Sequence, residues 1–456
     1  MDAAGERTSA RALTKGATVL WILVLCYAVN FADRTIINTL GEAIKDDLRL
    51  SDLQLGLLGG LSFAMLYCVS GLVVARFADR YNRVNILAGA VAIWSLLTML
   101  CGTAGNYLSL FLMRMGVGVG EAGCAPPAQS LISDYFPPNR RATAIAIYYT
   151  GVPLGVLGGA FAAGLLAEQI GWRMAFVVVG MPGLLLALLV WLVLREPPRG
   201  RFDGTPENTA AEAETPSFWA VVGAIWSTPG LRHIAAGTTL SAFASYSISQ
   251  FLHPLFVRGF DMSYANAALI YGLLGALSAG LGSPLGGYLA DKLSARDGRW
   301  MCWLPGIGLI MSAPFYFVGL FQENWMVLTA LLFIPGITHN FYHGPTYAAV
   351  HNALPSRMRA TSTAILIFLS AAIGLGLGPL STGLVSDVFA QTNYTGAGNY
   401  NAACIGTVAG PVDTDVQIAC REASSAGVRM ALLIASSVFI WAGLHYFIAA
   451  RALRRR

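Results

Sequence analysis

Long apolar stretches separated by short polar connections run along the whole chain, and they predict its architecture. Twelve stretches are long enough to cross about 30 Å of hydrocarbon as helices. They lie at residues 17–40, 53–75, 84–104, 107–130, 142–167, 172–194, 232–257, 264–290, 301–320, 324–350, 359–389 and 427–450. The pattern therefore predicts an all-α membrane protein with twelve transmembrane helices.

The composition excludes an ordinary soluble protein. The 456 residues are 55% hydrophobic and only 12% charged, whereas soluble domains carry about 25% charged residues. The 50 glycines are scattered along the chain, which suits close packing of helices in lipid. The net charge of +5 comes from basic residues between the apolar stretches. We therefore expect membrane lipids, and no nucleic acid, as partners.

The basic residues predict which side of the membrane each connection faces. Only six of the 29 lysines and arginines lie in or beside the connections that follow odd-numbered spans, namely Lys45, Arg49, Arg173, Arg258, Arg421 and Arg429. By the positive-inside rule, the other connections and both tails face the cytoplasm. The first apolar run is too long for a cleaved signal peptide. Only three of the basic residues are lysines, which favours a bacterial source and its inner membrane.

The chain repeats itself around a polar linker. FADR (77–80) is echoed by LADK (289–292), and FPPNRRATA (136–144) by LPSRMRATS (354–362). These repeats predict two pseudo-symmetric six-helix bundles, residues 1–195 and 232–456, joined by a cytoplasmic linker at 196–231. Within the linker, FWAVVGAIW (218–226) is too short to span and is expected to lie in the membrane interface. Parallel repeats of this kind favour a transporter that holds its substrate between the halves.

Four ionisable residues fall inside the apolar stretches of the first half. Asp33 and Arg34 lie in span 1, and Arg114 and Glu121 lie two turns apart on one face of span 4. Each costs about 2.5–3.5 kcal/mol to insert into a membrane, so each needs a partner or a task. Adjacent helical residues point about 100° apart, so we expect an Asp33–Arg114 pair, with Arg34 and Glu121 facing a central cavity. Asp33 and Glu121 are the predicted proton-coupling residues; a static ion pair is the alternative.

The second half lacks this ionic cluster at the matching positions. Span 7 offers Tyr246 and Gln250, and span 10 offers His339 and Tyr342. A charged wall opposite an aromatic wall would suit a small amphipathic or lipid substrate, with its headgroup toward Arg34 and Arg114. Ordinary packing of aromatic residues is the alternative.

The connections after the second span of each half resemble a known signature. ARFADRYNRVN (75–85) and GYLADK (287–292) resemble the signature loop of the major facilitator superfamily, although Ala75 and Asn82 replace the usual glycines. Within that superfamily, Asp33-Arg34, the stretch 114–122 and DRYNR (79–83) resemble the spinster family. The resemblance covers essentially the whole chain. It implies proton-linked transport of sphingosine-1-phosphate or lysophospholipids by rocking alternating access. Another cargo, such as a drug or an organic anion, and proton-independent facilitation stay open.

The resemblance also implies a gate on the cytoplasmic side. In the superfamily, the residue corresponding to Asp79 faces the start of span 11, where a helix N-terminus favours negative charge. We expect the gate to comprise the charged residues of the two signature loops, namely Asp79, Arg80, Arg83, Asp291 and Lys292. The alternative is that the basic residues only set topology.

Two cysteines lie together in a connection expected to face outward. Cys404 and Cys420 share the loop between spans 11 and 12, where an oxidising compartment would favour a disulfide; free thiols are the alternative. The other five cysteines lie in or beside spans and are expected to be buried apolar residues.

Three other sequence patterns could suggest a cofactor, a metal site or an enzyme, but we expect none of these. GVGEAG (118–123) matches a dinucleotide fingerprint, but no strand precedes it. His339 and His343 have metal-ligand spacing, but no third ligand stands out. No Walker A sequence or nucleophile–base pair is present, so we expect neither a cofactor nor an enzyme, and a monomer rather than an oligomer. A channel is the competing class.

Overall fold

The computed structural model describes residues 3–199, 201–202, 216–405 and 414–453, and this part of the chain is almost entirely helical. Ten stretches of it are long and apolar enough to cross a membrane. One of them, residues 143–193, breaks at Gly171, whose φ of 80° and ψ of 160° end one span and begin the next. Helix α10 (Pro229–Phe260) has the length of a span, with 32 residues, but a more polar composition. Together these helices make the twelve predicted spans.

The first half contains helices α1 to α8. Their bounds are α1 (Ala3–Leu48), α2 (Asp52–Gly59), α3 (Leu61–Arg80), α4 (Arg83–Cys101), α5 (Tyr107–Glu121), α6 (Ala125–Tyr135), α7 (Pro138–Tyr149) and α8 (Gly151–Val193). Span 2 consists of α2 and α3, span 4 of α5 and α6, and span 5 of α7 with the part of α8 before Gly171. The rest of α8 is span 6.

The second half follows the short helix α9 (Phe218–Ser227). Its helices are α10, α11 (Tyr264–Ser294), α12 (Trp300–Leu320), α13 (Trp325–His339), η1 (Asn340–Tyr342), α14 (His343–Ala353), α15 (Ser356–Leu369), η2 (Ser370–Leu375), α16 (Gly376–Thr392), η3 (Asn401–Ile405) and α17 (Thr414–Leu453). Span 10 runs from α13 to α14, and span 11 runs from α15 through the π-helical turn η2 to α16.

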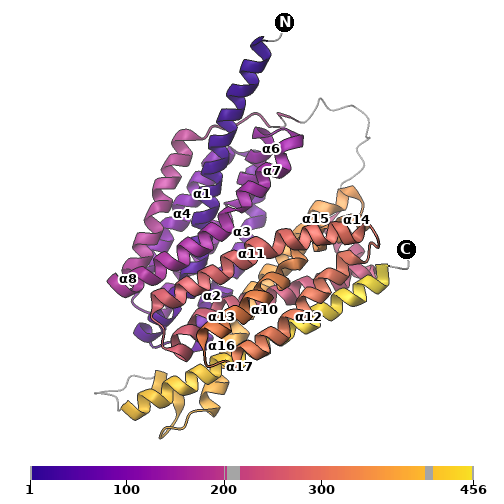
Figure 1. The fold of residues 1–456 in the computed structure, drawn as a ribbon. Helices are drawn as coiled ribbons and strands as arrows, with labels where there is room; N and C mark the ends of the chain where they lie inside the picture. The colour runs from indigo at the N-terminus through magenta and orange to yellow at the C-terminus, as the bar shows by residue number, and fades with distance from the viewer. Residues whose placement is uncertain (1–2, 200, 203–215, 406–413, 454–456) are drawn as a thin grey trace.

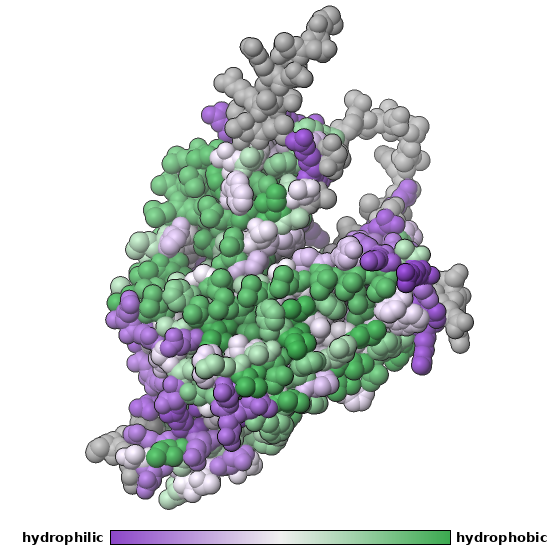
Figure 2. All heavy atoms as spheres, viewed as in Figure 1, coloured by the Kyte–Doolittle hydropathy of each residue, from purple (hydrophilic) through white to green (hydrophobic). Residues whose placement is uncertain are grey.

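The two bundles meet at one end and separate at the other. Figure 1 shows the start of α1 and the end of α17 at the end where the halves diverge, which we call the terminal side. The opposite end, where α2 lies beside α16, is the distal side. The space-filling view is hollowed between the halves on the terminal side, and apolar side chains cover the flanks of both bundles (Figure 2).

Glycines hold the halves together on the distal side, where α2 packs on α16 and α8 packs on α11. A Cβ atom added at Gly56 of α2 would lie 2.2 Å from the carbonyl oxygen of Pro379, and one at Gly383 of α16 would lie 2.1 Å from that of Asp52. On the other flank, a Cβ at Gly164 would lie 2.4 Å from Ala268. Only glycine allows the backbones to approach this closely.

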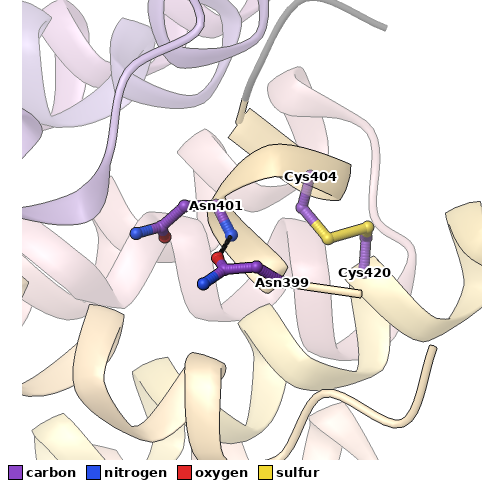
Figure 3. Close-up of a disulfide and its surroundings, with 4 residues drawn as sticks. All are labelled: Asn399, Asn401, Cys404 and Cys420. Carbon is purple, nitrogen blue, oxygen red and sulfur yellow. Dashed lines mark hydrogen bonds between the residues drawn. A yellow bond between two sulfur atoms is a disulfide. The ribbon is translucent and has the colours of Figure 1, made fainter. Parts of the chain in front are cut away.

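The linker and the loop after span 11 contain the two remaining expected features. Helix α9 covers the stretch expected to lie in the interface: Val221 and Ile225 are buried, whereas Trp219 and Trp226 are exposed. Its position at a membrane surface stays a prediction, and linker residues 200 and 203–215 lie outside the described residues. Cys404 of η3 and Cys420 of α17 form a disulfide with their Cα atoms 5.6 Å apart, beside Asn399 and Asn401 (Figure 3).

We predict that Gly56→Ala weakens the distal contact. The new methyl group would clash with the backbone of α16, and only a shift of that entire helix can relieve the clash. Spin-label distances across the distal side should lengthen, and the melting temperature should fall. The control is Gly71→Ala on α3 in the same span, where a Cβ meets nothing within 4 Å and alanine favours the helix. Equal distances in the two variants would contradict the prediction.

Candidate functional site: a buried charge cluster and a distal lock

Arg34 and Glu121 form an ion pair inside the first half. The Nε of Arg34 on α1 donates to Oε2 of Glu121 on α5 at 2.7 Å. The Glu121 side chain is fully buried, whereas the Arg34 side chain is 23% exposed. The Arg34 guanidinium also lies over the rings of Phe31, Phe63 and Tyr67, at 5.1, 5.1 and 4.6 Å from their centroids. Arg34 is thus held by one carboxylate and three aromatic faces while it keeps access to the outside of the bundle.

Asp33, the neighbour of Arg34 in sequence, has no hydrogen-bond partner. It is fully buried, and neither carboxylate oxygen makes a hydrogen bond. Nε and Nη1 of Arg114 also lack partners, and the Arg114 guanidinium lies 5.8 Å from the centre of the Phe63 ring. The Asp33–Arg114 pair expected from the sequence therefore does not form in this structure. The physical reason is that Asp33 lies beside α4, where the polar side chains of Trp94 and Thr98 are its neighbours.

The residues expected from the second half divide into two groups. Tyr246 is 38% exposed and lies within electrostatic range of Arg34, and Gln250 is buried against Gly59 of α2. His339 instead donates from Nδ1 to the carbonyl oxygen of Pro335 at 2.6 Å, and Tyr342 is buried and stacked on His343. The structure thus brings Tyr246 and Gln250 to the first half, whereas His339 and Tyr342 pack within the second.

One turn from Arg34 toward the distal side, α1 contacts the second half directly. Nδ2 of Asn38 donates to the hydroxyls of Ser249 on α10 and Tyr271 on α11, at 3.3 and 3.0 Å. The hydroxyls of Ser249 and Tyr271 are themselves 2.8 Å apart. This polar contact lies between the charge cluster and the distal side.

A single arginine then ties the halves together on the distal side. Arg258 of α10 contacts Glu42 of α1 through Nε at 2.7 Å and Nη2 at 2.5 Å. The same guanidinium contacts Asp52 of α2 through Nη1 at 2.7 Å and Nη2 at 2.8 Å. Nζ of Lys45 also binds Asp52, at 2.5 Å. Arg258 is only 8% exposed, so this cluster, which we call the distal lock, is a buried network of charge-assisted hydrogen bonds.

Two carboxylates extend the distal lock by capping helix N-termini across the halves. The Asp387 carboxylate on α16 accepts from the backbone N–H groups of Asp52 and Leu53 at the start of α2, at 2.9 and 2.8 Å. Glu168 on α8 accepts from the N–H of Ala265 at the start of α11, at 2.8 Å. The helix N-terminus is electropositive, so each carboxylate is favourably placed. The caps match under the repeat, because spans 2 and 8 and spans 5 and 11 correspond.

Sequence reasoning missed the distal lock. It assigned Lys45 and Arg258 to connections and did not single out Glu42, Asp52 or Asp387. One signal was present: Ser51 forms a capping box at the start of α2, and the repeat aligns it with Ser263 before α11. The partner that each helix end finds in the other half follows only from the tertiary packing.

The charged residues expected to form a gate on the terminal side make no contact between the halves among the described side chains. Arg83 is 1% exposed and binds Asp134 of α6 at 2.5 Å and Glu196, the first residue of the linker, at 2.6 Å. In this structure Arg83 holds the start of α4 against α6 and the start of the linker, and its role in the gate stays a prediction. Arg80, Asp291 and Lys292 are exposed, and the side chain of Asp79 lies outside the described residues. The described part of the chain also holds no group of three or more metal-ligating side chains.

Comparison with known proteins gives consistent matches over most of the chain. Residues 23–411 match the family model of the Major Facilitator Superfamily. An "MFS-type efflux pump" of Mycolicibacterium smegmatis is 32% identical over 80% of this chain and 83% of its own length. Human "Protein spinster homolog 1" is 29% identical over 82% of this chain and 74% of its own length.

A solved structure matches both in sequence and in fold. It is the crystal structure of a bacterial homologue of the human lysosomal transporter spinster, in an inward-facing and unoccupied conformation. It superimposes with a TM-score of 0.88 and 34% identity, and the match covers 97% of this chain and 98% of that one.

We predict that Arg258→Gln opens the distal side, because Glu42 and Asp52 would then be buried together with too little positive charge. Spin-label distances across the distal side should shift toward a longer population. The control is Arg173→Gln, which removes a half-exposed ion pair with Asp47 inside the first half; such exposed pairs contribute little. A distance distribution for Arg258→Gln that equals the wild type would contradict the prediction.

Proposed function

Because the chain belongs to the major facilitator superfamily, and within it to the spinster family of transporters, we propose that it is a proton-coupled secondary active transporter of an amphipathic lipid. The cargo would be a lysophospholipid or a molecule similar to sphingosine-1-phosphate. The protein moves this cargo without converting it chemically, by rocking its two halves around a site between them. We take it to act as a monomer in the inner membrane of a bacterium.

Alternating access is supported by the asymmetry of the contacts between the halves. The distal lock and the glycine contacts close one side, while the surface is hollowed on the terminal side (Figure 2). We infer from the distribution of basic residues that the terminal side is cytoplasmic. The structure then represents an inward-open state. In the opposite state the distal lock would break, and the expected gate residues Asp79, Arg80, Arg83, Asp291 and Lys292 would close the terminal side.

Proton coupling rests on one observation: Glu121 is fully buried and bound to an arginine that is itself partly exposed. An anionic headgroup that enters the hollow competes with Glu121 for Arg34. When Arg34 turns to the headgroup, a buried carboxylate loses its counter-charge, and taking up a proton becomes the cheaper state. Asp33, buried without a partner, supplies the second proton-binding carboxylate.

The energy available is sufficient for uphill transport. One proton that moves down 100 mV releases about 2.3 kcal/mol, which supports a concentration ratio of roughly fiftyfold at 1.4 kcal/mol per decade. No other source of free energy is needed for a single cargo molecule at this ratio.

The lipid cargo is supported by the surroundings of Arg34. A guanidinium bordered by Phe31, Phe63 and Tyr67, with the exposed ring of Tyr246 in electrostatic range, offers one cation and several apolar faces. This combination suits a molecule with an anionic head and an apolar tail. Gln250, at the contact with α2, would limit how far the head descends toward the distal side.

A second candidate is efflux of a drug or an organic ion, which is favoured by the relative named an efflux pump. The two cargo classes separate in one experiment with proteoliposomes and an imposed proton gradient. We expect uptake of fluorescent lysophosphatidylethanolamine and none of ethidium. Ethidium transport without lysolipid transport would favour efflux, and equal lysolipid flux with and without the gradient would favour proton-independent facilitation.

We predict that Asp33→Asn and Glu121→Gln each abolish lysolipid accumulation driven by a proton gradient while the protein still folds, because an amide cannot bind and release the coupled proton. The control is Asp47→Asn, which removes a carboxylate that is 43% exposed on the distal side and should leave accumulation within about twofold of the wild type. Unchanged uphill transport in both variants would show that neither carboxylate carries the proton.

A further inference from the structure

Two polar side chains of α4 are buried next to Asp33 without any partner. Trp94 and Thr98 are both fully buried, and neither the indole Nε1 nor the hydroxyl Oγ1 makes a hydrogen bond. Both lie beside the Asp33 carboxylate, whose own oxygens are also without partners. Buried polar groups are almost always hydrogen-bonded. Two donors, the Trp94 indole and the Thr98 hydroxyl, and one acceptor, the Asp33 carboxylate, lack a partner at the same place, which points to a common function.

The helices around Asp33 fix this arrangement. Trp94 and Thr98 are four residues apart and therefore lie on one face of α4. A Cβ atom at Gly120 of α5 would come within 2.8 Å of Trp94, so the glycine lets the two helices approach and holds the indole in place. On the other side of α1, Gly155 and Gly159 of α8 pack against the turn that holds Asp33. The close packing of α5 on α4 and of α8 on α1 therefore fixes the positions of the two helices that carry the α4 donors and Asp33.

Few ionisable groups compete for the same carboxylate. Glu121 and Arg114 of α5 are the charged residues that act on Asp33, and the thiol of Cys101 on α4 lies within electrostatic range. The glycines that α8 presents at this point carry no ionisable group. The buried Nε and Nη1 atoms of Arg114 make no hydrogen bond to Asp33. The two α4 side chains are the uncharged donors beside it.

We propose that Trp94 and Thr98 are positioning residues that set the pH at which Asp33 takes up its proton. When Asp33 loses its proton, the indole N–H and the Thr98 hydroxyl close onto the charged carboxylate and donate to it. When Asp33 is protonated, the hydroxyl can rotate and accept from the carboxylic O–H, whereas the indole can only donate. Hydrogen bonds to a charged group are the stronger ones, so both residues favour the charged form. This inference rests on the proposed role of Asp33 in proton coupling.

The effect of removing either donor follows from that difference. Without one donor the charged carboxylate loses stabilisation, so Asp33 keeps its proton to a higher pH. The loss of one hydrogen bond to a charged group corresponds to a shift of roughly one pH unit. A purely structural role would lower the thermal stability but leave the pH of the transition unchanged.

The experiment is a pH titration of the full-length protein in lipid nanodiscs, with a spin-label pair across the distal side. Thr98→Val and Trp94→Phe should each raise the midpoint of the conformational change by about one unit. Thr98→Ser, which keeps the hydroxyl, should restore the wild-type midpoint. The matched control is Ser95→Ala: Ser95 is also on α4, fully buried and without a partner, but its hydroxyl faces Gly183 of α8.

The outcomes separate this inference from the proposed function. If the wild type responds to pH and Asp33→Asn does not, but Thr98→Val and Trp94→Phe titrate as the wild type does, the positioning role is overturned and the proton-coupling role stands. If the wild type ignores pH, or Asp33→Asn responds equally, both are overturned. Melting curves establish that each variant is folded, and should Trp94→Phe fail to fold, Thr98→Val with its Thr98→Ser rescue decides alone.

Discussion

The architecture depends on the cost of leaving a charge unpaired away from water. Each buried charge must find an opposite charge, a set of hydrogen-bond donors or a proton. On the distal side the need is met by Arg258, which carries two first-half carboxylates and thereby joins the halves. In the core of the first half it is met within one bundle, by the Arg34–Glu121 pair. The same physical constraint thus produces a closed interface in one place and a titratable cluster in the other.

These two networks differ in what can disturb them. The guanidinium of Arg258 is almost fully enclosed by first-half carboxylates and Ser424, so its release requires the halves to move. The Arg34 side chain is 23% exposed, so in the proposed mechanism a ligand competes for it while the helices stay in place. Asn38 lies on α1 between them and contacts α10 and α11. A change at Arg34 therefore has a short path, along one helix, to the contacts that keep the distal side shut.

The repeat explains why the two halves contribute equivalent groups to the distal contact. Asp387 caps the start of span 2, and Glu168 caps the start of span 8, so each half supplies one carboxylate and one helix end. The glycines at the distal contact also come from both halves. Gly56 and Gly383 lie where α2 and α16 cross, and Gly164 lies where α8 meets α11. The ionic cluster breaks this symmetry, since only the first half contains it. The proposed proton binding is thus confined to the first half, whereas alternating access requires both halves to move.

The sequence by itself determined the number of spans, the two halves and the membrane location, because apolar length and residue repeats are local properties that lipid acts on directly. It also singled out Asp33, Arg34, Arg114 and Glu121, since a charge in an apolar run is conspicuous wherever it occurs. Only the tertiary structure decided which charged residues form ion pairs with one another. Arg34 rather than Arg114 holds a carboxylate, Asp33 lies beside α4, and Arg258 reaches Glu42 across 216 residues. Partners in a helical bundle are chosen by the rotation and crossing of helices, and these depend on packing between segments that are distant in the sequence.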